Sequence, residues 1–188
     1  MENTQPTQMQ VSTKYALIGS LLLIIAGMAL YMMGVMNNTV SNVINLVVMS
    51  IAIVLGLRTY RDETLGGSLT FGQGFGTGML ISLIMGVLMA IWTYVFMAFV
   101  APDFIEKILD MSRESMIDRG MDDDTIEQAM KQTAAFMTPA MMSVFAVVGT
   151  LLFGLVISLI SAAIIQKKPD PELQYEEEIL DSTDSESV

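Results

Sequence analysis

The segment GGSLTFGQGFGTG, from Gly66 to Gly78, has the composition of a phosphate-binding loop, with six glycines in thirteen positions. A dinucleotide-binding loop needs G-x-G-x-x-G between a strand and a helix, but Thr77 or Met79 occupies the third glycine position here. A Walker A loop needs Lys followed by Ser or Thr, whereas Gln73 and another glycine follow Gly72. The segment is therefore not predicted to bind a phosphate group.

Two other groups of residues have the chemistry of metal ligands. Met28, Met32 and Met36 share one helical face, and thioethers suit Cu(I), but Met is also an ordinary filler of apolar packing. The run Asp122–Asp124 lacks the ligand spacing of a calcium loop, so helix capping and solvation explain it better. The chain has no Cys and no His, which excludes thiol nucleophiles, Ser-His triads and Cys/His metal sites. We predict no metal and no cofactor.

The apolar residues are concentrated in four long segments of the chain. Of its 188 residues, 53% are apolar and 15% are charged, with a mean hydropathy of +0.57, whereas soluble domains carry about a quarter charged residues. The segments approach or exceed the ~20 residues that cross a ~30 Å hydrocarbon core. They cover about residues 15–36, 40–57, 74–100 and 139–165, and none contains Asp, Glu, Lys, Arg or His. This pattern predicts an all-α, polytopic membrane protein with four transmembrane helices.

Two of these segments have alternative interpretations. The apolar core of the second is short, so it could be a re-entrant or interfacial helix, although a short span in a locally thinned bilayer is more economical. The first could be a cleaved signal peptide. Against cleavage, its apolar run is longer than a typical signal core, and no clear small-x-small site follows Tyr31.

The connection between the third and fourth spans, residues 101–138, is predicted to be a helical hairpin insertion outside the bilayer. Gly120 is a plausible end of its first helix, and Asp122 a plausible N-cap of its second. Thr138 and Pro139 then predict the N-cap and first residue of the last span. The apolar residues at helical spacing are Phe104, Ile105, Ile108, Leu109 and Met116 in the first helix, and Ile126, Met130, Thr133, Ala134 and Met137 in the second. We expect this apolar stripe to lie on the membrane or on a partner.

The remaining segments complete the predicted organisation. Residues 1–13 form a polar N-terminal tail, and residues 14–168 form the four-helix transmembrane domain with its insertion. Residues 169–188 carry eight carboxylates, no basic residue and two prolines. This composition predicts a disordered acidic tail, which is solvated or, alternatively, binds a partner.

Basic residues close to the span ends predict the orientation of the chain in the membrane. Lys14 precedes the first span, Arg58 and Arg61 follow the second, and two lysines beginning at Lys167 follow the fourth. The connection between the third and fourth spans holds nine acidic and four basic residues. We therefore expect both termini in the cytoplasm and this connection on the outside.

Small residues recur every four positions in the third and fourth spans. They are Gly74, Gly78, Ser82, Gly86 and Ala90 in the third span, and Thr150, Gly154, Ser158 and Ala162 in the fourth. Apolar side chains gain little by leaving lipid, so membrane helices associate where small residues let their backbones approach. We predict that the two faces meet, within one chain or across a dimer. The alternative is that small residues are simply common in membrane helices.

Several segments of the chain resemble the bacterial domain-of-unknown-function family 4199. They are YRDETLGGSLTFGQGFGTG, APDFIEKILDMSRESMIDRGMDDDTIEQAM, FMTPAMM and GLVISLISAAIIQKK. Their markers are a Gly-Gly-x3-Phe-Gly-Gln start, the Pro-Asp after the third span and the Thr-Pro before the fourth. The resemblance covers about residues 14–168 and leaves the acidic tail outside. It implies a four-span bacterial inner-membrane protein with a helical insertion before the last span, and it implies no activity, substrate or catalytic residue.

Our leading functional hypothesis is a non-catalytic membrane subunit, assembly factor or organiser that acts by helix association. Its partners would be the lipid bilayer and either further copies of the chain or another membrane protein, with no nucleic acid. The alternative is a small oligomeric transporter or channel. Asn45, Thr93 and Gln73 are the conspicuous polar groups near such a path. No ionisable residue lies inside a predicted span, whereas ion-coupled pathways usually need one.

A third hypothesis is an enzyme at the membrane surface. Asp103, Glu106 or the Asp122–Asp124 run would supply its acid and base. Such an enzyme needs paired carboxylates in a cleft, which sequence alone does not show. We expect no enzymatic activity.

Overall fold

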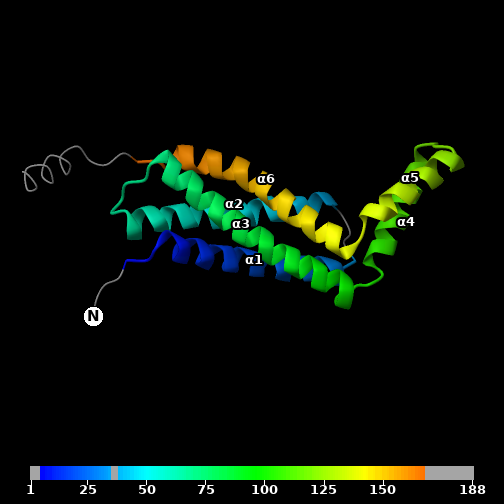
Figure 1. Ribbon diagram of the computed structural model, residues 1–188, viewed down its shortest axis with the longest axis horizontal. Coiled ribbons are helices and arrows are strands. Elements are labelled where there is room, and N and C mark those ends of the chain that lie inside the picture. Colours follow the sequence, from blue (N-terminus) through cyan, green and yellow to red (C-terminus); the bar gives the residue numbers. More distant parts are fainter. Residues whose placement is uncertain (1–4, 35–37, 168–188) are drawn as a thin grey trace, which may run out of the picture. The chain divides into compact units, whose positions relative to one another are not determined.

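The computed structural model describes residues 5–34 and 38–167, and its regular elements are helices (Figure 1). In chain order they are α1 (Gln8–Met32), α2 (Asn38–Thr59), η1 (Tyr60–Thr64), α3 (Phe71–Val95), η2 (Phe96–Val100), α4 (Phe104–Asp118), α5 (Asp123–Phe136) and α6 (Pro139–Ile165). The π-helical turns η1 and η2 directly follow α2 and α3. No strand occurs in the described ranges, where one isolated bridge pairs Leu69 with Lys167. The predicted all-α fold is confirmed.

Four helices of the described part are long and apolar enough to cross a bilayer. They are Gln8–Met32, Thr39–Thr64, Phe71–Val100 and Pro139–Ile165. Large apolar side chains on them are exposed, for example Leu152 at 62% and Ile164 at 76%. Apolar exposure along whole helices marks a surface that contacts lipid rather than water. The chain is a multi-pass membrane protein. Its short second apolar segment reaches spanning length because the helix begins early, at Asn38, and continues through η1.

Two of the long helices begin with the same hydrogen-bonded capping box. The Thr7 hydroxyl accepts a bond from the Gln10 N–H (3.3 Å), and the Thr7 N–H donates to the Gln10 side-chain oxygen (2.9 Å). Thr70 and Gln73 make the same pair of bonds at the start of α3 (3.3 and 3.0 Å). The box satisfies backbone donors that a helix end leaves free. Residues 8–13, which composition assigns to the polar tail, are therefore helical.

The connection between the third and fourth long helices contains α4 and α5. Gly120, just after α4, has φ +73°, the left-handed conformation that ends helices. Asp122 stands at the N-cap position of α5, but its carboxylate accepts a hydrogen bond from the Thr125 hydroxyl (2.7 Å) and makes no capping bond to the backbone. Thr138 accepts a hydrogen bond from the first turn of α6, which begins at Pro139. These helix boundaries, expected from local turn chemistry, are confirmed. The expected acidic tail, residues 169–188, lies outside the described residues.

The chain divides into two compact units, Met1–Ile84 with Phe153–Val188, and Met85–Leu152. In the described part of the first unit, α1, α2, the first half of α3 and the second half of α6 pack together. Met49 of α2 and Ile81 of α3 are fully buried there. In the second unit, Ile126 of α5 is buried at 3% exposure. The full burial of Met49 and Ile81 shows that the first unit holds a close-packed helical core.

Candidate functional site

Small residues of α3 and α6 lie directly against each other in the first unit. A Cβ atom built on Gly78 would lie 2.7 Å from the Cβ of Ser158 and closer still to its Oγ. A Cβ built on Gly154 would lie against the Oγ and Cβ of Ser82. Real Cβ atoms do not approach other heavy atoms this closely, so both positions accept only glycine without a local shift.

The two helices are antiparallel at this contact. Moving four residues forward along α3 corresponds to moving four residues backward along α6. A Cβ on Gly74 would lie 3.2 Å from the Cβ of Ala162. In the second unit, a Cβ on Gly86 would lie 3.5 Å from the Cβ of Thr150, which is ordinary contact. Ala90 is half-buried. The structure thus brings the two small-residue faces together within one chain, at the positions named.

Helix α2 packs against the same α3–α6 contact from the side. The Cγ2 atom of Ile53 lies 3.3 Å from the position of a Cβ on Gly78, and the Cε atom of Met49 lies 2.8 Å from a Cβ on Gly154. Both side chains are fully buried. They fill the space beside the glycines and so fix which helices can meet there.

Sequence reasoning missed a further close contact, at Gly56 of α2. A Cβ built on it would run into the Cδ1 atom of Ile81 and lie 3.6 Å from the Cβ of Tyr15. Ala52 and Gly56 form a small-x3-small pair, the spacing that would have identified this position. Side chains of α1 and α3 therefore approach the backbone of α2 closely at Gly56.

Hydroxyl groups take part in this helical core. The Ser82 hydroxyl donates to the Gly78 carbonyl (2.8 Å) and is fully buried. The Thr77 hydroxyl accepts a bond from the Gln8 side chain (3.0 Å), which joins α1 to α3. Among the described residues, the hydroxyls of Ser12, Ser20 and Ser158 are buried without a hydrogen-bond partner. An unpaired buried hydroxyl costs about 1–3 kcal/mol.

The polar groups considered for a transport path are placed differently from one another. The side-chain oxygen of Gln73 accepts bonds from the Thr70 N–H (3.0 Å) and hydroxyl (2.9 Å), so this amide caps α3. Asn45 and Thr93 are half-buried. Gln73 is therefore committed to helix capping rather than to a path.

The carboxylates considered for catalysis are exposed. Asp103, Glu106 and Asp122–Asp124 all lie at the surface. Asp103 forms a hydrogen-bonded ion pair with Lys107, one turn further along α4. The hydrogen bond from Lys107 lowers the pKa of the Asp103 carboxyl. In the ranges that the structure describes, no group of three His, Cys, Asp or Glu residues could hold a metal ion. This exposed arrangement differs from the paired carboxylates in a cleft that acid–base catalysis requires.

The methionines considered as copper ligands are not gathered into a buried cluster in the described part. Met28 is half-buried, and Met32 is 81% exposed. Met36 lies outside the described residues. These positions give no support to a thioether site.

Comparison with known protein families identifies the chain. The family model described as Protein of unknown function (DUF4199) matches residues 14–167. No curated protein and no solved structure matches the chain. Because the family match covers most of its length, the chain belongs to DUF4199, and the resemblance stated from its sequence motifs is confirmed.

Proposed function

We propose that this DUF4199 protein is a non-catalytic membrane subunit or organising factor that binds a partner protein through α4 and α5. In this proposal the four long helices anchor the chain, and α4 and α5 form a helical hairpin outside the bilayer. The observation that carries the proposal is the set of large apolar side chains that are exposed on these two helices, outside the stripe, whose first-helix residues are half-buried. No residue of α4 is buried, and Ile117 and Phe136 are 55% and 58% exposed. Exposed large apolar side chains that lie close together mark surfaces that contact a partner protein or a membrane.

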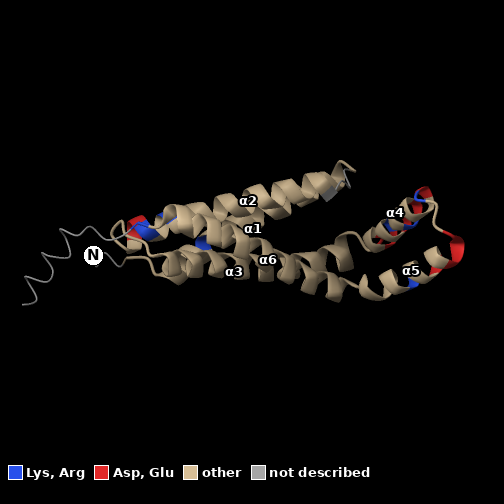
Figure 2. Ribbon diagram, turned by 90° about the horizontal axis from the view of Figure 1, so that it is seen from above, with Lys and Arg blue, Asp and Glu red and all other residues tan. Residues whose placement is uncertain are grey.

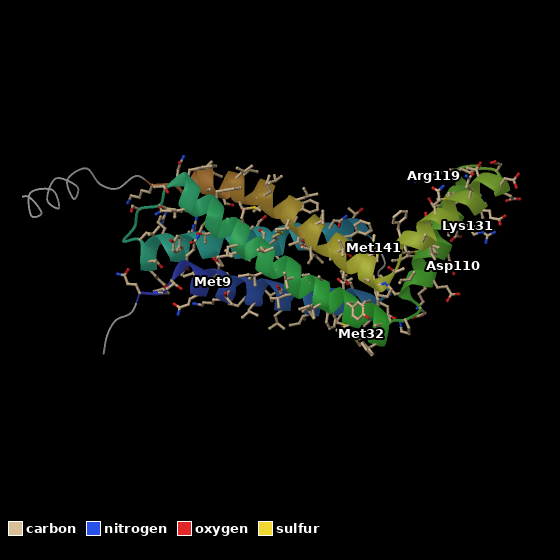
Figure 3. All side chains as sticks on the ribbon, viewed as in Figure 1. Met9, Met32, Asp110, Arg119, Lys131 and Met141 are labelled. Atoms are coloured by element: carbon tan, nitrogen blue, oxygen red, sulfur yellow. The ribbon has the colours of Figure 1, made fainter. Side chains whose placement is uncertain are left out.

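The charge of the same segment favours a protein partner over the bilayer surface. Residues 101–138 carry nine acidic and four basic residues, and the ribbon in Figure 2 marks acidic residues on α4 and α5 and in the turn between them. In Figure 3, Asp110, Arg119 and Lys131 lie on this segment with their side chains directed outward. An acidic surface is repelled by anionic lipid headgroups. A partner with an apolar patch bordered by basic residues is complementary to it.

The orientation that we propose places α4 and α5 outside a bacterial inner membrane and both termini in the cytoplasm. The basic residues that support it are Lys14, Arg58, Arg61 and Lys167. The chain has no native Cys, so a single introduced cysteine reports its own side of the membrane. Ser115→Cys should react with a membrane-impermeant maleimide in intact spheroplasts, and Gln10→Cys only after permeabilisation. The reverse pattern would contradict the orientation.

The subunit proposal is tested by the mass of the complex extracted in mild detergent from its own membranes. Wild type should carry a second protein in fixed stoichiometry. The double variant Ile117→Gln, Phe136→Gln should lose that protein, because it removes two exposed apolar contacts. Met9→Gln is the control, since Met9 is a 57% exposed apolar residue of the first unit, near the N-terminus. A homo-oligomer with the same mass in all three proteins would contradict the proposal.

A second candidate function, a small transporter or channel, is favoured by the unpaired hydroxyls of Ser12, Ser20 and Ser158. Buried polar groups are rare in membrane helices unless they serve packing or a polar path. Flux through proteoliposomes should then fall in Ser158→Ala and in Asn45→Leu. Absence of flux, or flux that both variants leave intact, would count against this function.

A further inference from the structure

Four basic residues gather at one end of the first unit, where α2 meets η1. We name this set the Arg58 cluster: Lys14, Arg58, Arg61 and Lys167. The ribbon in Figure 2 marks basic and acidic residues at this end of α2, while most of the length of the long helices has neither. We propose that the Arg58 cluster binds the phosphate of an anionic phospholipid whose acyl chains lie along the outer faces of α1, α2 and α6.

Three contacts bring the members of the cluster together from different helices. The Tyr15 hydroxyl and the Thr59 hydroxyl are hydrogen bonded at 2.7 Å, and these residues directly follow Lys14 and Arg58. The bridge between Leu69 and Lys167 (2.8 and 2.9 Å) ties the end of α6 to the loop that follows η1.

The third contact is electrostatic. Arg58, Arg61 and Lys167 all act on the carboxylate of Asp62. Positions far apart in the sequence therefore present their positive charge at the same end of the unit.

The positive charge of the cluster is only partly neutralised by the protein. Arg61 is committed to Asp62, with Nε–Oδ1 and Nη2–Oδ2 distances of 2.7 and 3.2 Å. Arg58 and Lys167 are exposed and form no ion pair in the part of the chain that the structure describes. Lys14 is exposed beside the ring of Tyr15, 5.6 Å from its centre. Three cations thus remain available at the level where a spanning helix meets phospholipid headgroups.

A phospholipid fits this surface better than a free phosphate ion. Three or four residues from each of the three available cations, toward the middle of its span, stands an exposed apolar side chain. These side chains are Ile18 in α1 (49% exposed), Leu55 in α2 (44%) and Ile164 in α6 (76%). A ligand that uses both features must join a phosphate to hydrocarbon chains, as a phospholipid does. The excess positive charge selects an anionic headgroup over a zwitterionic one.

Native mass spectrometry of the full chain in mild detergent, titrated with phosphatidylglycerol or phosphatidylcholine, tests the proposal. Wild type should bind phosphatidylglycerol more tightly. Each lost cation should weaken phosphatidylglycerol binding about fivefold, and the double variant Arg58→Gln, Lys167→Gln about 25-fold. Phosphatidylcholine binding should not change. The matched control Arg113→Gln, Lys131→Gln removes the same charge from the second unit and should bind both lipids as wild type does.

Three outcomes would overturn the proposal. The first is equal affinity of wild type for the two lipids, and the second is an equal loss of phosphatidylglycerol binding in the control variant. The third is competition by inorganic phosphate that displaces phosphatidylglycerol completely, which would make the free ion the ligand. If the double variant does not fold by circular dichroism, Arg58→Gln alone must still show the fivefold loss.

Discussion

One added methyl group at Gly154 should destabilise the helical bundle, whereas the same addition at Gly149, in the same helix, should not. At Gly154 the new Cβ would collide with the side chain of Ser82 and lie 2.8 Å from the Cε atom of Met49. At Gly149 nothing lies within 4 Å of the new atom. The two Gly→Ala variants therefore add the same methyl group to the same helix. They differ only in the space that surrounds the new Cβ atom.

The size of the difference follows from two opposing terms. Alanine in place of glycine stabilises a helix by up to about 1 kcal/mol, and both variants gain this. Overpacking costs typically about 1–3 kcal/mol, and only Gly154→Ala incurs it. Ser82 cannot turn aside freely, because its hydroxyl is bonded to the Gly78 carbonyl at 2.8 Å, a bond worth about 1 kcal/mol. Gly154→Ala should therefore be destabilised by about 1–2 kcal/mol, and Gly149→Ala unchanged or slightly stabilised.

Reversible unfolding in mixed micelles, by titration with sodium dodecyl sulfate and far-ultraviolet circular dichroism, measures both free energies. The swap Ser82→Gly, Gly154→Ser moves the hydroxymethyl group from α3 to α6 at the same contact and should recover most of the stability lost in Gly154→Ser. Two results would refute the packing argument. One is an equal unfolding midpoint for Gly154→Ala and Gly149→Ala, and the other is a double variant that is no more stable than Gly154→Ser alone.

Three further predictions concern the helix ends and the exposed ion pair. Thr70→Ala removes the hydroxyl that caps α3 through Gln73 and should cost about 0.5–2 kcal/mol in the same titration. Gly120→Ala forces a side chain into φ +73° and should cost about 1 kcal/mol, seen as faster amide hydrogen exchange in the last turn of α4. Asp103→Asn should leave the unfolding midpoint at neutral pH unchanged, because the pair with Lys107 is exposed. The folded-state pKa of Asp103 is lowered, so any contribution is present at neutral pH. It can disappear only as the pH falls through that lowered value, so a difference from wild type that grows at higher pH would contradict this assignment.

The sequence was sufficient for the features that depend on composition or on local turn chemistry. The four long helices follow from apolar segments without ionisable residues, because only helices of that length satisfy their backbone inside a bilayer. Gly120 and Pro139 mark helix ends because their backbone preferences act locally. The early start of α1 could also be predicted from the sequence, since Thr7 and Gln10 have the T-x-x-Q spacing of a capping box.

The partner of each small residue could not be predicted. Small residues at every fourth position identify one face of a helix. If the neighbouring helix is shifted by four residues, small residues still meet small residues. The same residues could also pair with a helix of a second chain. The register that places Gly78 against Ser158 depends on the shapes of Met49 and Ile53 in a third helix. The sequence of a single segment does not predict such packing among three helices. The unpaired hydroxyl of Ser12 was likewise invisible, because burial is a property of the assembled bundle.

The discontinuity of the first unit sets an order for its assembly during synthesis. Its closing contact joins Ser82 to Gly154, and at typical translation rates the chain between them takes roughly 4 to 14 s to make. Through that interval α1, α2 and the first half of α3 have been made without the helix that covers Gly78 and Ser82. Until α6 has been made, the nascent bundle thus exposes the face of α3 that holds Gly78 and Ser82 to lipid or to a neighbouring insertion factor. The bridge between Leu69 and Lys167 can form only after that, at the end of the last span.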